Sequence, residues 1–197
     1  MNWDNAVIFA GGKSSRMGED KALLPFGGYD TLAEYQCRRL EPLFERVSLS
    51  AKEDKFPFIS PIILDRYEGS SPLVALASVL ESVQSEWVFV LSVDMPNVDA
   101  ELIDQLYRTR QIEPRAHAIV ATSSMGSEPL CALYHRDILP AVMAQLRESN
   151  HRMRSLIAAV PSVEVNCPRD EVFANLNTPE EYARLLTQSD TGAPHAR

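Results

Sequence analysis

A stretch rich in glycines, small hydroxyl residues and cations follows directly on an apolar run near the start of the chain. Residues 6–21 read A-V-I-F-A-G-G-K-S-S-R-M-G-E-D-K. Gly11 and Gly12 let the backbone approach a ligand and adopt positive φ, and successive N–H groups in such a loop form an anion-binding concavity. Arg16 and Lys21 add positive charge, and an arginine can hold two phosphate oxygens at once. The stretch therefore predicts a phosphate-binding loop at the end of a buried strand.

Two standard phosphate loops do not fit this stretch. A Walker loop needs a glycine five residues before Gly12, where the chain has Val7, and the dinucleotide fingerprint needs its second glycine at Lys13. A polar surface loop that happens to contain glycines would explain the Gly-Gly pair alone. It does not explain the pair together with the hydroxyls and cations that follow.

Two aspartates come directly after other apolar runs. Asp94 follows residues 87–93, which read as a strand buried on both faces, and Pro96 prevents that strand from continuing. A carboxylate at a strand end can hold Mg²⁺ that is shared with substrate phosphates. Asp65 follows residues 62–64 in the same way. For both aspartates, a helix cap or a turn is the alternative role.

Short apolar runs alternate with longer amphipathic ones, the pattern of βαβ units around a mainly parallel sheet. We expect strands at residues 6–10, 47–50, 62–64, 87–93, 118–122, 130–134 and 163–165. Helical spacing of apolar residues predicts helices at residues 32–44, 73–83, 100–108, 138–147 and 153–160. The capping box T-P-E-E at residues 178–181 starts a last helix.

These elements predict a Rossmann-like three-layer α/β/α fold with a mainly parallel sheet. We expect one domain over residues 1–188 and a disordered tail at residues 189–197, which are small and polar. Ligands of such folds bind at the carboxyl ends of the strands. The glycine-rich loop and both strand-end aspartates should therefore converge at one edge of the sheet.

The composition limits the class of protein. A chain of 197 residues with 45% hydrophobic residues fits an ordinary globular domain, and a net charge of -8 argues against a broad nucleic-acid-binding face. Residues 1–4 carry no basic region and the apolar run behind them stops at Gly11, so we predict neither a signal peptide nor a membrane span and expect a cytoplasmic protein. Cys37, Cys131 and Cys167 lack C-x-x-C spacing, and we interpret them as reduced and structural.

The string A-G-G-K-S-S-R-M-G-E-D-K-A-L-L at residues 10–24 closely resembles the signature loop of the molybdenum cofactor guanylyltransferase family of nucleotidyltransferases. Three more segments resemble that family in the same order: I-I-L-D at residues 62–65, S-V-D-M-P at 92–96 and F-A-N-L-N-T-P-E-E at 173–181. The match extends from residue 6 to about residue 186. The resemblance implies a fold of the nucleotide-diphospho-sugar transferase type.

The resemblance also implies a reaction and a set of functional residues. The enzyme would transfer GMP from GTP to the terminal phosphate of molybdopterin or Mo-molybdopterin, with Mg²⁺ as cofactor and pyrophosphate as product. The implied catalytic residues are Arg16, Lys21 and Asp94, with Asp94 as the metal ligand. The implied nucleotide-binding residues are Phe9, Ala10, Gly11, Gly12, Lys21, Ser50, Asp65 and Asp94. Proteins that insert molybdenum and mature molybdoenzymes are the implied partners, with no nucleic acid and no membrane.

The resemblance assigns the pterin substrate to Asn175 and Asn177, which would point to the same side of an extended segment. Two positions depart from the family. Ser50 stands where the family often has asparagine, and in S-S-P-L-V-A at residues 70–75 Ser71 and Ala75 replace the glycines of the family's G-P-L-A-G. The backbone approach to a ligand can differ there.

Three alternative functions remain open. Related cytidylyltransferases typically have A-A-G where this chain has A-G-G at residues 10–12, and the missing Cβ at Gly11 leaves room for a purine and favours GTP. A sugar-phosphate nucleotidyltransferase has a similar loop but usually a longer chain. A nucleotide-binding accessory protein without turnover would need neither Lys21 nor Asp94.

The histidines give weaker signals. His151, Arg152 and Arg154 form a basic cluster that either reaches the phosphate of a second substrate or is a solvated helix face. His117 and His135 lie beside expected strands, with no partner at metal-ligand spacing in the sequence. We assign these two histidines no chemistry.

Overall fold

The computed structural model describes residues 3–11, 20–176 and 178–189. Its strands are β1 (Trp3–Phe9), β2 (Phe44–Ala51), β3 (Ile62–Leu64), β4 (Trp87–Ser92), β5 (Ala118–Ser123), β6 (Gly126–His135) and β7 (Ser162–Asn166). They form a seven-stranded sheet in the order β3-β2-β1-β4-β6-β5-β7. β6 pairs antiparallel with β4 and β5, and the other neighbouring strands pair in parallel. The predicted mainly parallel sheet is confirmed.

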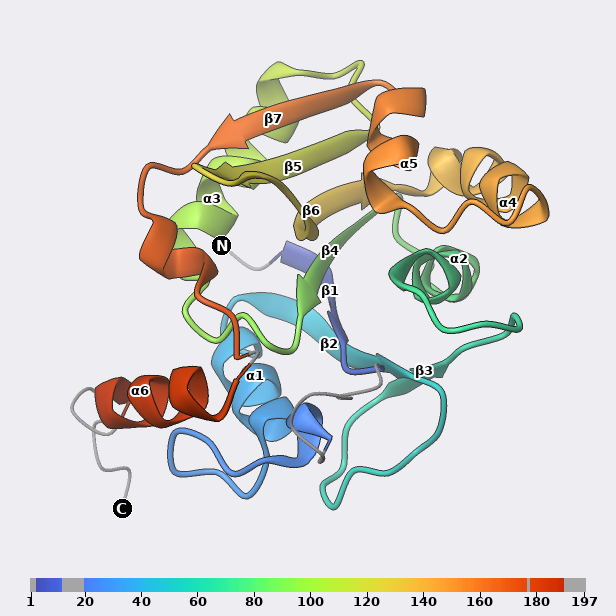
Figure 1. Cartoon of the computed structure of the whole chain (residues 1–197). Coiled ribbons are helices and arrows are strands. Elements are labelled where there is room, and N and C mark those ends of the chain that lie inside the picture. Colours follow the sequence, from blue (N-terminus) through green and yellow to red (C-terminus); the bar gives the residue numbers. More distant parts are fainter. Residues whose placement is uncertain (1–2, 12–19, 177, 190–197) are drawn as a thin grey trace.

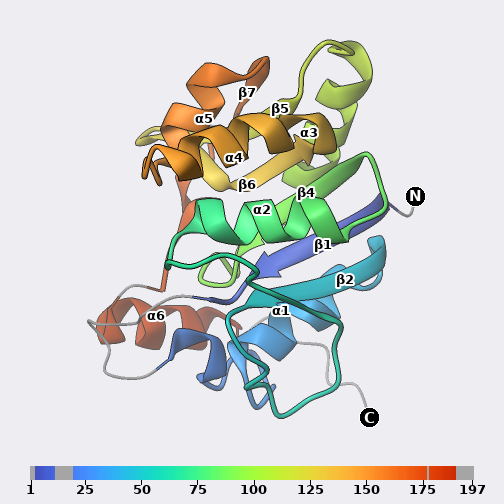
Figure 2. The ribbon, with the colours of Figure 1, turned by 90° about the vertical axis from the view of Figure 1, so that its right-hand side faces the viewer.

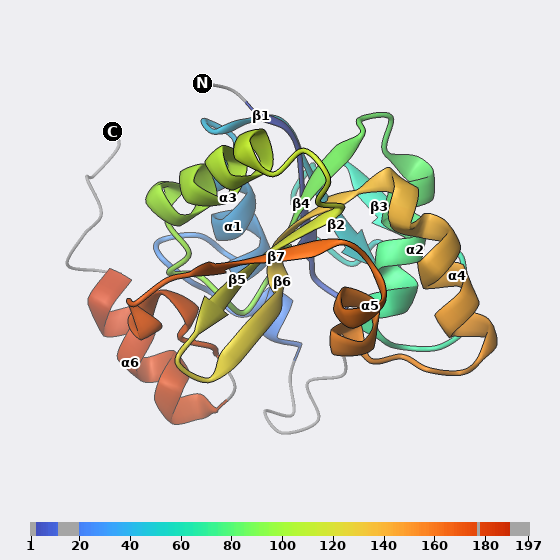
Figure 3. The same ribbon diagram turned by 90° about the horizontal axis from the view of Figure 1, so that it is seen from above.

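Helices cover both faces of this sheet (Figures 1 and 3). α1 (Leu32–Leu40), α3 (Ala100–Ile112) and α6 (Pro179–Ser189) lie on one face, and α2 (Pro72–Ser82), α4 (Leu139–Arg147) and α5 (Met153–Ala159) lie on the other. Three short 3₁₀ helices complete the described elements, namely η1 (Lys21–Leu23), η2 (Arg136–Ile138) and η3 (Asp170–Phe173). The three-layer α/β/α arrangement is the predicted one.

The two faces of the sheet build two hydrophobic cores. Successive side chains of a strand point to opposite faces, so Ala6 and Ile8 of β1 pack in the core under α1 and α3, while Val7 and Phe9 pack in the core under α2 and α4. Figure 2 shows α2 and α4 lying across this second face. Every residue of β4 is buried, as expected for a strand covered on both sides.

Several elements end at other residues than expected. The helix expected over residues 32–44 stops at Leu40, because Phe44 begins β2 and its ring packs between Trp3 and Phe89. α3 continues to Ile112 instead of residue 108, and β6 begins at Gly126 because its polar first residues form a hairpin with β5. The other element ends differ by a few residues at most.

The carboxy-terminal helix begins as predicted. The Thr178 N–H donates to Glu181 Oε2 at 2.9 Å, and the Glu181 N–H donates to Thr178 Oγ1 at 3.2 Å, which is the reciprocal pattern of a capping box. Ser189, where we expect the tail to begin, is still part of α6. Residues 190–197 lie outside the described part of the chain.

Two further sequence-based expectations concern the chain as a whole. The three cysteines are free and buried, in line with a structural role. Among the described residues, no helix combines the length and the apolar character that crossing a bilayer requires.

Candidate active site

Four neighbouring parallel strands end at the same edge of the sheet. Phe9 at the end of β1 pairs with Ser50 of β2 on one side and with Ser92 of β4 on the other. Asp65 directly follows β3, and its N–H donates to the carbonyl of Ala51 at 3.0 Å. Asp65, Ser50, Phe9 and Ser92 therefore form a row across the four strand ends. Neighbouring strands lie about 4.8 Å apart, so this row spans about 14 Å. The convergence predicted for the strand-end residues is therefore present.

A cavity of about 410 Å³ opens at this edge, a volume within the usual range for small-molecule sites. It lies between the ends of β1 and β4, the segment after β2 and β3, and the start of α2. The lining residues are Phe9, Gly11, Lys52, Asp65, Ser70, Ser71, Pro72, Ala75, Ser92 and Leu130. The cavity brings together three of the residues predicted to bind nucleotide, and both positions where the family's glycines are replaced.

Gly11 lines the cavity in a conformation open to any residue. Its φ is not positive, so the left-handed backbone that a glycine permits is not used there. Among the described residues, the atom nearest to a Cβ at this position would be Ala51 Cα, at 3.5 Å. That distance is an ordinary van der Waals contact. Gly12, the second glycine of the predicted pair, lies outside the described residues, as does Arg16.

The ends of β2 and β3 carry two unsatisfied polar atoms, and one of them belongs to Asp65, which lines the cavity. In the described part of the chain, Ser50 Oγ and Asp65 Oδ1 are buried without a hydrogen-bond partner. Buried polar atoms in proteins are normally bonded, so such orphans call for an explanation. Burial raises the pKa of the Asp65 carboxyl above its usual range, and the positive charge of Lys52 partly opposes this rise. This carboxylate has an acceptor oxygen available for a donor from a ligand.

Lys52 was not singled out from the sequence. It directly follows β2, which is the same strand-end position that drew attention to the two aspartates. A search for any charged residue at a strand end would therefore have found it.

Asp65→Asn is expected to raise the stability of the protein at neutral pH. Because the folded-state pKa lies above the unfolded-state value, the folded protein holds a proton between those two pKa values that the unfolded chain has lost, and stability falls as the pH rises through this window. An asparagine has no charge to desolvate. The variant should melt above the wild type at neutral pH and match it below the unfolded-state pKa of about 3.9.

Thermal melts of both proteins from about pH 3 to pH 8 measure this difference. Glu68→Gln, which alters an exposed carboxyl in the same loop, is the matched control and should leave the melting temperature unchanged. Equal melting of Asp65→Asn and the wild type at every pH would contradict the argument.

Asp94 stands at the other end of the row. Ser92 Oγ donates to Asp94 Oδ1 at 2.6 Å, and Lys21 Nζ lies 3.7 Å from Asp94 Oδ2. The alternative role of Asp94 as a helix cap is excluded, because Asp99 caps α3 by accepting from the Leu102 N–H at 2.9 Å. Two residues with predicted catalytic roles, Lys21 and Asp94, thus lie in direct contact.

The turn that carries Asp94 is fixed from three sides. The Val93 N–H donates to the carbonyl of Phe9 at 3.1 Å, and the side-chain amide of Gln36 donates to the carbonyl of Val93 at 3.0 Å. The Leu176 N–H donates to the carbonyl of Asp94 at 3.1 Å. This last bond places the segment with the half-buried Asn175 beside the Asp94 turn, whereas Asn177 lies outside the described residues.

Lys55 is another residue that the sequence did not reveal. Its Nζ donates to the carbonyl of Ala10 at 3.3 Å and forms an ion pair with the carboxylate of Asp20. Asp20 Oδ1 also accepts from the Ala22 N–H at 3.0 Å and so caps η1, the turn that carries Lys21. Lys55 therefore joins the exit of β1 to the residues that position Lys21.

The basic cluster of residues 151–154 divides between two places. His151 Nδ1 lies 2.8 Å from Ser71 Oγ at the cavity. Arg154 instead lines a separate cavity of about 530 Å³ together with Ser127 and Glu164. The cluster is therefore not one surface that could hold a single phosphate.

A three-layer α/β/α domain with polar residues gathered at the carboxyl ends of its parallel strands defines the class of nucleotide-binding α/β proteins. The family model for the MobA-like NTP transferase domain matches residues 6–186. The chain belongs to this family.

Similar proteins and structures agree with that family. The chain is 35% identical to a molybdenum cofactor guanylyltransferase from Campylobacter jejuni subsp. doylei, over 95% of this chain and 98% of the relative. It is 33% identical to a molybdenum cofactor guanylyltransferase from Helicobacter pylori, over 94% of this chain and 91% of the relative.

The structure of molybdopterin-guanine dinucleotide biosynthesis protein A from Archaeoglobus fulgidus superposes with a TM-score of 0.81 at 18% identity, over 95% of this chain and 99% of that one. A 2-C-methyl-D-erythritol 4-phosphate cytidylyltransferase from Thermus thermophilus superposes with a TM-score of 0.71 at 17% identity, over 96% of this chain and 100% of that one. At these identities the two structures show a shared fold.

Proposed function

We propose that this protein transfers GMP from GTP to the terminal phosphate of molybdopterin or Mo-molybdopterin and releases pyrophosphate. The observation that carries the proposal is the row at the sheet edge, with an unsatisfied buried carboxylate oxygen at Asp65 and the Lys21–Asp94 pair at the opposite end. The first end suits a base and the second suits a triphosphate. The names of the guanylyltransferase relatives support the choice of reaction.

The base would be recognised near Asp65. Guanine presents an N–H and an amino group side by side as donors, and a carboxylate can accept both with its two oxygens. Asp65 Oδ1 is an acceptor without a donor in the described structure, which supports this pairing. Lys52 lies close enough to interact with the Asp65 carboxylate and lines the same cavity, so it would keep this carboxylate ionised.

The transfer needs no side-chain nucleophile. A phosphate oxygen of the acceptor forms the new bond to the α-phosphorus of GTP, the bond from that phosphorus to the bridging oxygen breaks, and pyrophosphate leaves with the electron pair. A phosphomonoester has its second pKa near about 6, so the attacking oxygen is already ionised at neutral pH. The protein then contributes alignment and charge stabilisation, which are the main factors in phosphoryl transfer.

Asp94 offers carboxylate oxygens, the kind of ligand atom that Mg²⁺ prefers. Its carboxylate is held through Oδ1 by Ser92, and a Mg²⁺ ion is usually bound by one or two carboxylates together with substrate phosphates. When bound there, the ion would neutralise charge on the phosphates. Lys21 would balance charge on the leaving pyrophosphate, and we assign the same role to Arg16.

The pterin substrate would lie on the side of Asp94 that faces residues 173–176. The hydrogen bond from the Leu176 N–H to the backbone carbonyl of Asp94 supports this assignment, because it holds the segment next to the residue to which we assign the metal. We assign pterin contacts to Asn175 and Asn177 on this basis.

Pyrophosphate release from labelled GTP, CTP and UTP tests the proposal when Mg²⁺ is present and the acceptor is molybdopterin, a sugar phosphate or absent. We expect release with GTP that depends on molybdopterin. Release that prefers CTP would favour a cytidylyltransferase, and release that depends on a sugar phosphate would favour a sugar nucleotidyltransferase. GTP binding without turnover in every mixture would favour an accessory protein.

Gly11→Ala is expected to lower the ratio of kcat/KM for GTP to kcat/KM for CTP by about 10-fold, the usual effect of one methyl group in a binding pocket. The described part of the protein accommodates the new Cβ, since its nearest atom lies 3.5 Å away. The change therefore reports on the bound base. Steady-state kinetics with both nucleotides measure the ratio, and an unaltered melting temperature shows that the fold is intact. An unchanged ratio would remove Gly11 from base selection.

A further inference from the structure

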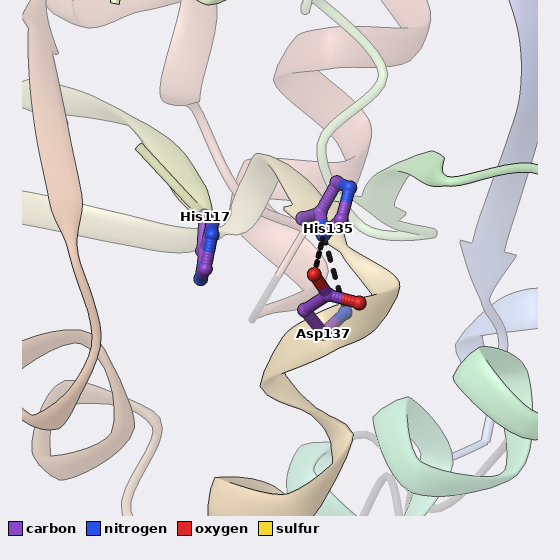
Figure 4. Close-up of side chains that lie close together, drawn as sticks. All are labelled: His117, His135 and Asp137. Carbon is purple, nitrogen blue, oxygen red and sulfur yellow. Dashed lines mark hydrogen bonds and ion pairs between the residues drawn. The ribbon is translucent and has the colours of Figure 1, made fainter. Parts of the chain in front are cut away.

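Two histidines and an aspartate lie together at the edge of the sheet opposite the active site (Figure 4). His117 directly precedes β5, His135 ends β6, and Asp137 lies in η2. His135 pairs with Trp87 at the start of β4, whereas the active site lies at the end of that strand. One potential ligand atom from each of the three residues lies within 4.8 Å of the others, an arrangement that no other group of three His, Cys, Asp or Glu side chains shows in the described part of the chain.

We propose that His117, His135 and Asp137 bind a divalent transition-metal ion, with Zn²⁺ as the best fit. Imidazole nitrogens together with a carboxylate oxygen suit Zn²⁺, whereas Mg²⁺ and Ca²⁺ prefer oxygen ligands alone. Three protein ligands would leave a fourth position for water. This site is separate from the Mg²⁺ proposed at Asp94 and does not depend on the proposed transfer reaction.

The backbone fixes the two histidines next to each other. The His135 N–H donates to the carbonyl of His117 at 2.9 Å, and the His117 N–H donates to the carbonyl of Pro161 at 2.7 Å. The two rings stack with centroids 5.3 Å apart and planes 21° apart, and the Trp87 ring packs edge-on against His135 at 5.0 Å. A metal ion would thus meet two ligands whose Cα positions are already set, which reduces the entropy lost on binding.

The side chain of His135 already faces Asp137. Its Nδ1 accepts a hydrogen bond from the Asp137 N–H at 3.2 Å and lies 3.5 Å from Asp137 Oδ2. A nitrogen and a carboxylate oxygen that could both bind the ion therefore lie side by side, and the imidazole would bind it in its neutral form. The ion would take the place of the backbone donor.

Small side-chain rotations would complete the site. Zn²⁺ lies about 2.0–2.1 Å from nitrogen and oxygen ligands, so tetrahedral ligand atoms are about 3.3 Å apart. The present spread of up to 4.8 Å must therefore shorten. Asp137 can supply this movement, because its side chain is 63% exposed. The exposure of Asp137 also provides the path by which the ion enters.

A metal-free sample of the full chain without a histidine tag, titrated with Zn²⁺ against a chromophoric chelator in excess Mg²⁺, tests the proposal. We expect one Zn²⁺ per chain and a Zn²⁺-dependent rise in melting temperature, since a ligand that binds only the folded state stabilises it. His117→Asn and His135→Asn should each weaken Zn²⁺ binding by at least ~10-fold, because loss of a supporting partner alone has that effect. Co²⁺ should give visible absorption bands in the wild type that both variants lose.

His151→Asn and His195→Asn are the matched controls, since these are the other two histidines of the four in the chain. Both should bind Zn²⁺ as the wild type does. Asp137→Asn alters an exposed side chain that the fold does not need, and it should also bind at least ~10-fold more weakly. Absence of one-to-one binding, equal binding by Asp137→Asn, or binding that either control removes would each overturn the proposal.

Discussion

Lys21→Ala is expected to lower kcat/KM for guanylyl transfer by at least ~10²-fold, the usual cost of removing one group that stabilises transition-state charge. Lys21 lies in η1 with its ammonium 3.7 Å from Asp94 Oδ2, at the triphosphate end of the row. As pyrophosphate leaves, negative charge increases on its oxygens, and a fixed cation in a partly buried site stabilises that charge strongly. Rates of pyrophosphate release at saturating and limiting GTP measure the loss.

The kinetic pattern separates catalysis from binding. If Lys21 acts mainly in the transition state, kcat and kcat/KM fall together, whereas a role in ground-state binding raises KM and leaves kcat unchanged. Arg108→Ala is the control, since it removes an exposed cation that pairs with Asp104 on α3, away from the cavity. A Lys21→Ala protein that folds and turns over at a near-normal rate would exclude Lys21 from the mechanism.

The parts of the site that the sequence revealed are those that local patterns determine. A buried strand must end where Pro96 follows it, so the strand-end position of Asp94 could be predicted from the apolar run of residues 87–93. The same reasoning located Asp65 and the glycine-rich loop. Sheet order then decides which strand ends are neighbours, and the alternating βαβ pattern was sufficient to predict a shared edge.

The parts that the sequence missed depend on how distant segments meet. Lys55 lies in an irregular segment between β2 and β3, and its contacts with Ala10 and Asp20 follow only from the folded path of that segment. His117 and His135 become neighbours through the antiparallel pairing of β5 with β6. That register contains an irregularity after Val120, so counting residues along the sequence could not have aligned the two histidines.

The difference between the two aspartates follows from their surroundings. Asp65 has a buried oxygen without a hydrogen bond, and Asp94 already has Ser92 and Lys21 as neighbours. An isolated buried acceptor suits a neutral donor such as a base N–H group. A carboxylate beside a lysine, at the place where phosphates would lie, suits a charged network of metal, phosphate and ammonium. The two strand ends therefore have different proposed partners although their sequence patterns are alike.

Asp94→Ala is expected to lower turnover by at least ~10²-fold and to raise the Mg²⁺ concentration needed for half-maximal rate. The variant removes the carboxylate to which we assign the metal, but it keeps the backbone carbonyl that accepts from Leu176, so the turn and the neighbouring segment should stay in place. Asp104→Asn, at a half-buried position on α3 away from the cavity, is the matched control and should leave both quantities unchanged.

Combining Asp94→Ala with Lys21→Ala tests whether the two residues act as one unit. Residues in direct contact show non-additive effects, and those that serve one catalytic step can cost little more together than singly. We therefore expect the double variant to be much less than ~10⁴-fold slower than the wild type, although two independent losses of ~10² would multiply to that value. If the two effects multiply in full, Lys21 and Asp94 act independently of each other. For the single variant, a wild-type rate of Asp94→Ala at the usual Mg²⁺ concentration would exclude the Asp94 carboxylate from metal binding.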